Sequence, residues 1–85
     1  GPRNMIKTFI LTIQVCSSVL SNCLPPAEII EPFKTHNECA LKGYELALKT
    51  HQNLIQQRGE LESNKYKVAV KFWCKEGKEE IKTDA

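Results

Sequence analysis

The residues of this sequence with the widest choice of chemistry are its four cysteines. Cys16, Cys23, Cys39 and Cys74 lie in a chain of only 85 residues, and His36 stands three positions before Cys39. Thiol side chains support three kinds of chemistry: disulfide cross-links, metal coordination and nucleophilic attack. Which of the three applies depends on where the folded chain places the sulfur atoms.

Disulfide cross-linking is the first interpretation. A chain of this length buries only a modest core, so covalent cross-links are a common support for proteins of this size. Four cysteines allow three pairings, and the sequence alone does not select one. If the fold gathers the cysteines at one end, as argued below, Cys16 would pair with Cys74 and Cys23 with Cys39.

A zinc site or a reactive thiol is the alternative. Cys23, His36, Cys39 and Cys74 are the zinc ligands to consider, although the short Cys-X-X-Cys knuckle of most zinc sites is missing. A helix amino terminus activates a thiol, which would suit Cys39 as a nucleophile. The sequence shows no glycine-rich phosphate loop, carboxylate pair or Ser-His-Asp pattern, so we expect no enzymatic activity, no catalytic residue and no cofactor.

Two segments show the alternation of a β-strand. Residues 8–16 place apolar side chains at every odd position, and residues 66–75 place them at every even position. Between them, the Ser- and Pro-rich residues 17–26 predict an irregular connection. Residues 27–33 predict an extended strip, which Pro32 excludes from the centre of a sheet.

A long helix is predicted ahead of the second strand. Thr35 followed by Glu38 fits a capping box, and Gly59 ends the helix after Arg58. Gly43, inside the helix, is expected to permit the close approach of another element. Apolar side chains at helical spacing predict the face that packs on the core. They are Ala40, Leu41, Tyr44, Ala47, Leu48, His51, Leu54 and Ile55.

Strand, helix, strand predicts an α+β fold: a small β-α-β unit of two parallel strands and one long helix, stabilised by disulfides. The ends of both strands and the start of the helix then meet at one end, which gathers all four cysteines. Two strands under one helix leave a face and two edges open. We therefore expect a partner chain to complete or cover the sheet in a homo-oligomer, with Trp73, Ile10, Lys71 and Lys67 at the interface.

The chain is expected to hold one domain, residues 5–75. Gly1-Pro2 resembles the scar of a cleaved expression tag, so residues 1–4 are interpreted as its remnant. Residues 76–85 are predicted to form a charged flexible tail. Twelve basic against ten acidic residues give a net charge of +2, which does not indicate a nucleic-acid partner.

Residues 5–22 have a second interpretation as a secretory signal. Lys7 is followed by an apolar run, and Leu20-Ser21-Asn22-Cys23 is a poor lipoprotein-cleavage box. The polar residues at alternate positions favour a strand instead. The run is also shorter than the roughly 20 residues that a membrane span needs, so we expect no span here.

Three short motifs together resemble a known group of proteins. They are Asn22-Cys23-Leu24-Pro25-Pro26, Asn37-Glu38-Cys39 at the head of the helix, and Lys71-Phe72-Trp73-Cys74-Lys75. With the apolar start from Met5, residues 5–75 resemble small cysteine-containing proteins of marine bacteriophages. The sequence departs from that group at His36, where an aromatic residue is common. The group has no established activity, so the resemblance implies a viral origin and a disulfide-rich, βαβ-like domain.

These observations lead to one expected function and two alternatives. We expect a non-enzymatic phage accessory protein, a small disulfide-stabilised module that binds a host or virion protein. The alternatives are a zinc- or thiol-dependent protein that uses the clustered cysteines, and an exported or lipoprotein-like phage protein with residues 5–22 as its signal. Disulfides formed by the usual route would place the protein in the host periplasm or outside the cell, and reduced thiols in the host cytoplasm.

Overall fold

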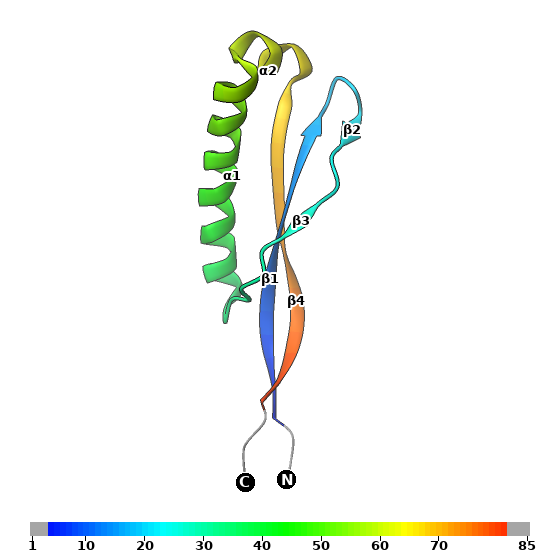
Figure 1. Cartoon of the computed structure of the whole chain (residues 1–85). Helices are drawn as coiled ribbons and strands as arrows, with labels where there is room; N and C mark the ends of the chain where they lie inside the picture. The colour runs from blue at the N-terminus through cyan, green and yellow to red at the C-terminus, as the bar shows by residue number, and fades with distance from the viewer. Residues whose placement is uncertain (1–3, 82–85) are drawn as a thin grey trace.

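The fold is built on a long ribbon of two antiparallel strands with one helix along its face (Figure 1). The computed structural model describes residues 4–81, and the molecule is elongated, 59 × 21 × 18 Å. In chain order the elements are β1 (Asn4–Ser17), β2 (Asn22–Cys23), β3 (Ala27–Glu28), α1 (His36–Arg58), α2 (Glu60–Tyr66) and β4 (Val68–Ile81).

The ribbon pairs β1 with β4 over their whole lengths. The register runs from Asn4 opposite Ile81 to Ser17 opposite Val68. Side chains alternate between the two faces along both strands, as their sequences predict. Residues that lie opposite each other in the two strands share a face. One face carries the pairs Leu11–Cys74 and Ile13–Phe72, and α1 packs against this face.

The expected parallel β-α-β unit is wrong, because the sheet is antiparallel. The reason lies in the segment between β1 and α1. After a turn at residues 18–21, β2 and β3 run back along the outer edge of β1, and Phe33 bridges to Phe9 near the middle of the strand. The helix therefore starts beside the middle of β1, near Phe9, and not beside its end, and β4 returns in the opposite direction (Figure 1).

Two segment boundaries also differ from expectation. Residues 60–65, which separate the predicted helix from the predicted second strand, lie in α2. Lys67 then caps α2 in the left-handed conformation, at φ 47°, and β4 begins at the next residue. Residues 76–81, predicted as part of a flexible tail, continue β4, because antiparallel pairing with the first residues of β1 satisfies the backbone groups that face β1. Residues 1–3 of the predicted tag remnant and residues 82–85 of the predicted tail lie outside the described residues.

Helix α1 begins and ends where its capping residues predict. The Glu38 backbone N–H donates to the Thr35 hydroxyl at 3.1 Å, which satisfies one of the donors left open at a helix start. At the other end, Gly59 adopts φ 84°, and its N–H donates to the Ile55 carbonyl at 2.8 Å. Glycine suits this conformation because side chains rarely adopt a positive φ.

The core between α1 and the ribbon is thin. Leu11 and Cys39 are fully buried, and Gly43 is the other buried residue of α1. A Cβ atom added at Gly43 would overlap the ring of Phe72, so the absence of a side chain lets α1 settle onto β4. The expectation of a close approach at Gly43 is therefore confirmed.

The apolar stripe predicted as the core face of α1 is wrong in part. Leu41, Tyr44 and Leu48 are exposed to 71%, 68% and 61%. The contact with the ribbon is made instead through Cys39 and Gly43. At about 100° per residue, Gly43 lies about 100° around the helix from Tyr44 and about 140–160° from Leu48 and Leu41. The disulfide to Cys74 and the glycine set this rotation, because both bring the helix backbone close to β4.

Candidate interaction surface

All four cysteines form disulfides, which confirms the structural interpretation of the thiols. The predicted pairing is corrected: Cys16 bonds Cys23, and Cys39 bonds Cys74. The prediction assumed that the strands are parallel and that their ends meet. In the antiparallel ribbon Cys16 lies opposite Ala69, so Cys74 sits five residues farther along β4, out of reach of Cys16.

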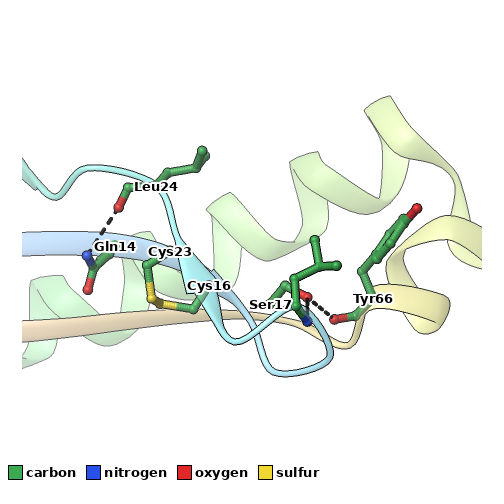
Figure 2. Close-up of a disulfide and its surroundings, with 7 residues drawn as sticks. Gln14, Cys16, Ser17, Cys23, Leu24 and Tyr66 are labelled. Atoms are coloured by element: carbon green, nitrogen blue, oxygen red, sulfur yellow. Dashed lines mark hydrogen bonds between the residues drawn. A yellow bond between two sulfur atoms is a disulfide. The ribbon is translucent and has the colours of Figure 1, made fainter.

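The Cys16–Cys23 disulfide closes the turn between β1 and β2 (Figure 2). The two residues are directly opposed, with Cα atoms 4.0 Å apart, in a position of the ladder where backbone hydrogen bonds do not join them. The Gln14 side-chain amide donates to the Leu24 carbonyl at 3.1 Å just beyond the bridge. On the other side, the Ser17 hydroxyl donates to the Tyr66 carbonyl at 2.7 Å and ties this end of the ribbon to α2.

The Cys39–Cys74 disulfide clamps the first turn of α1 to the middle of β4. It takes up two of the four residues considered as zinc ligands, and Cys23 is bonded to Cys16. His36 lies against the ring of Phe9, edge to face, with ring centroids 5.9 Å apart. The structure thus does not bring Cys23, His36, Cys39 and Cys74 together, and within residues 4–81 no other cluster of three or more potential metal ligands occurs.

The face of the ribbon turned away from α1 is called the open face here. It carries Ile10, Lys71 and Trp73, because even positions of β1 and odd positions of β4 point away from the Cys39–Cys74 clamp. Trp73 lies opposite Thr12, which is buried although it is on this side. The indole is 39% exposed, so most of its surface lies on the sheet while the remainder is accessible. Three of the four predicted interface residues therefore share one face.

Charged side chains border Trp73 on the open face. The Lys75 ammonium lies 3.6 Å from the Glu28 carboxylate, which links β4 across β1 to β3. Lys71, on the other side of Trp73, is exposed. It lines a shallow hollow together with Cys16 and Cys23, at the end of the ribbon that their disulfide closes. The open face is thus an aromatic side chain between two lysines.

Lys67, the fourth predicted interface residue, lies elsewhere. It caps α2, six residues before Trp73, which is about 20 Å along an extended strand. It lines a hollow on the helix side together with His51 and Ile55. The left-handed backbone at Lys67 breaks the strand alternation on which the prediction depended.

Sequence reasoning missed a second surface, the exposed stripe of Leu41, Tyr44 and Leu48 on α1. Tyr44 remains in contact with the ribbon through Phe72, with ring centroids 4.8 Å apart and planes at 81°. The stripe therefore lies beside β4. Gly43 was the signal in the sequence that could have indicated this surface. A glycine within a helix permits the closest contact with another element, and Leu41 and Leu48 lie on a different face of the helix from Gly43.

A third apolar feature is a hollow of about 330 Å³ at the closed end of the ribbon. Its apolar lining comes from the β1–β2 turn, the residue after β2, the ends of α1 and α2, and the start of β4. The residues are Leu20, Leu24, Leu54, Tyr66 and Val68, with Arg58 and Glu62 forming an ion pair at 3.8 Å beside them. The buried Ser63 hydroxyl also lines it.

Comparisons with known proteins add no relative. No family model, no curated protein and no solved structure matches the chain. Among the described residues, no helix combines the length and apolar character needed to cross a membrane.

Proposed function

We propose that this protein is a non-enzymatic interaction module that binds another protein through its open face. The observation that carries the proposal is the indole of Trp73, partly exposed on the side of the ribbon that α1 does not cover. Tryptophan is the residue type most enriched among the side chains that dominate binding energy at protein interfaces. Bacteriophage origin is part of the same proposal and is supported by the resemblance of the three short motifs.

The surroundings of Trp73 favour a protein partner with a defined chemistry. The two disulfides cross-link the elements around the ribbon beneath it, so little backbone order is lost on binding. Ile10 extends the apolar contact area, and Lys71 adds a positive charge at its border. A partner surface with an apolar pocket for the indole and a carboxylate facing Lys71 would match this face.

The test starts with capture of the partner from host cells by the disulfide-bonded protein, followed by affinity measurement with the purified partner. Trp73→Ala should weaken binding at least tenfold, and Lys71→Glu should slow association most strongly at low salt. Ile30→Ala is the matched control, because Ile30 is an equally apolar residue that is 97% exposed in the loop before α1. Unchanged affinity of Trp73→Ala would rule out the open face as the binding surface.

A further inference from the structure

The outer edge of β4 is an unsatisfied hydrogen-bonding surface. The direction in which the N–H and C=O groups of β4 point follows from the hydrogen bonds that β1 makes on its other side, with residues 24–33. Phe9 exchanges two bonds of 2.8 Å with Phe33, and the carbonyls of Leu11 and Val15 accept from Ile29 and Leu24. Odd positions of β1 therefore face β2 and β3, and even positions face β4.

This parity determines which groups of β4 point outward. Residues of β4 opposite even positions of β1, such as Trp73 opposite Thr12, bond to β1. Val70, Phe72 and Cys74 lie opposite odd positions, so their N–H and C=O groups point to the outer edge. Among residues 4–81, only β1 pairs with β4. A long strand edge of this kind is a template for another strand.

The apolar stripe of α1 lies beside this edge. Tyr44 contacts Phe72, and the exposed Leu41 and Leu48 lie about one helical turn to either side of it. On the opposite flank of α1, Lys42 and Lys49 each form an ion pair with Glu45. One continuous surface therefore combines backbone donors and acceptors with apolar side chains.

We infer that the chain forms a two-fold dimer in which β4 pairs with β4 of a second copy, with Phe72 at the axis, and the two apolar stripes pack together. The contact is made through the outer edge of β4 and the apolar stripe, and it borders the open face of the proposed function at Lys71 and Trp73. The axis stands perpendicular to the sheet, so both α1 helices lie antiparallel on one face and both open faces lie on the other. The stripe is nearly symmetric about Tyr44, so Leu41 of one copy meets Leu48 of the other.

The spacings of regular structure fit this arrangement. Neighbouring strands lie about 4.8 Å apart, and packed helices lie about 8–10 Å apart. Each helix would then sit about 4–5 Å from the axis, which places it above its own β4. The observed packing agrees, since α1 contacts β4 more than β1.

Charge selects the register. With Phe72 opposite itself, Lys71 lies opposite Trp73 of the second copy, a favourable cation–π geometry, and Lys75 lies opposite Ala69. A slip of one residue in each copy, with Trp73 at the axis, would place Lys71 opposite Lys75. Like charges directly opposed across strands are destabilising, so a second copy of this chain prefers the Phe72 register.

The exposed area indicates that there is room for such an interface. The chain exposes 6698 Å², whereas a monomer of its 9.7 kDa mass typically exposes about 5,100 Å². The difference of roughly 1,600 Å² exceeds the ~800 Å² that each partner contributes to a standard interface. A dimer would bring the exposed area closer to that of ordinary proteins of this size.

Sedimentation equilibrium of the disulfide-bonded full chain tests the inference. We expect a reversible dimer with twice the 9.7 kDa mass at micromolar concentrations. Leu41→Lys combined with Leu48→Lys should weaken the dimer at least about 30-fold. The matched control is Ile30→Lys with Leu61→Lys, which changes two side chains that are 97% and 90% exposed outside the stripe. A monomer at millimolar concentration, or equal weakening by the control pair, would overturn the proposal.

Amide hydrogen exchange tests the edge independently of any substitution. The N–H groups of Val70, Phe72 and Cys74 should be protected at high concentration and exchange rapidly on dilution. Those of Lys71 and Trp73, which face β1, should stay protected at both concentrations. Rapid exchange of the first set at concentrations where the chain is dimeric would show that β4 is not the contact, and the inference would fail.

Discussion

The contact between Gly43 and Phe72 is the closest approach of helix and ribbon. In an isolated helix, alanine is more favourable than glycine by about 1 kcal/mol. At Gly43 the added methyl group would overlap the Phe72 ring, and overpacking of this kind costs about 1–3 kcal/mol. We expect Gly43→Ala to lower the free energy of unfolding by about 1 kcal/mol in denaturant titrations.

A double-mutant cycle separates this clash from other effects of the substitution. In the background of Phe72→Leu, whose side chain is smaller, Gly43→Ala should cost less, with a coupling of at least about 0.5 kcal/mol. Asn53→Ala, at an exposed position of the same helix, serves as the control and should be neutral or stabilising. Equal costs in both backgrounds would mean that the ring of Phe72 does not restrict position 43.

At this scale the sequence predicted some contacts and not others. Thr35 and Gly59 could be identified as caps because their effect depends only on neighbouring residues. The Cys16–Cys23 and Cys39–Cys74 pairing could not, because it depends on the path of residues 24–33, which contain no strong local signal for a return along β1. Lys67 was misplaced because a single left-handed residue is not visible in an alternating pattern.

The two disulfides tie different elements and should differ in their contribution to stability. Cys39–Cys74 joins α1 to β4 across 35 residues, whereas Cys16–Cys23 closes a turn of 7. Because a disulfide restricts the unfolded chain, the long loop is expected to add about 4 kcal/mol to the free energy of unfolding and the short loop about 2 kcal/mol. Cys39→Ala with Cys74→Ala should therefore lower the unfolding free energy more than Cys16→Ala with Cys23→Ala does.

The same difference should appear during reduction. Cys23 is exposed, whereas Cys39 is fully buried, so a small dithiol reaches the first disulfide more easily. Alkylation and mass analysis during mild reduction should label Cys16 and Cys23 before Cys39 and Cys74. The opposite order would show that the α1–β4 clamp opens more readily than the end of the ribbon.

Glu45 on α1 gives the helix a pH dependence. The hydrogen bond from Lys49, at 3.1 Å, together with the charges of Lys42 and Lys49, lowers the pKa of Glu45 below its ordinary value of 4.5. A carboxyl whose pKa falls on folding stabilises the native state above its unfolded pKa, and this stabilisation is lost as the pH falls through the lower, folded pKa. The contribution is small, because all three side chains are exposed and screened.

The measurable consequence is a stability difference between the native chain and Glu45→Gln. It should be present at pH 7 in low salt, disappear as the pH falls below 4.5, and shrink in 1 M salt. In the background of Lys49→Met the difference at pH 7 should be smaller. A difference that is independent of pH would assign the effect to helix propensity.

The elements themselves were largely predictable, and their orientation was not. Strand alternation and helix caps are local signals, so β1, α1 and β4 were found. The rotation of α1 was misjudged because Leu41, Tyr44 and Leu48 continue the apolar pattern without a break, and hydrophobicity alone does not distinguish a core face from an exposed one. The direction of β4 relative to β1 follows from the short β2 and β3 strands, whose residues do not alternate long enough to be recognised.

The whole molecule is long and thin for its chain length. Its radius of gyration is 16.9 Å, whereas a compact chain of this length has about 12 Å. Among the residues whose burial the structure describes, the largest fully buried side chains are those of Leu11 and Cys39, and Cys39 is a disulfide cysteine. Such a molecule depends on its cross-links and, by our inference, on a second copy for a substantial part of its stability.

That dependence predicts a melting temperature that varies with protein concentration. If folding and dimerisation are coupled, each tenfold increase in concentration adds about 1.4 kcal/mol per dimer, which corresponds to about 3–6 °C for a chain of this size. The variant with Leu41→Lys and Leu48→Lys should melt at a lower temperature that does not change with concentration. The pair Ile30→Lys and Leu61→Lys should retain the native dependence, because both side chains are almost fully exposed and lie outside the stripe. A native melting temperature that is constant from micromolar to millimolar concentration would mean that the monomer is stabilised by its two disulfides and thin core alone.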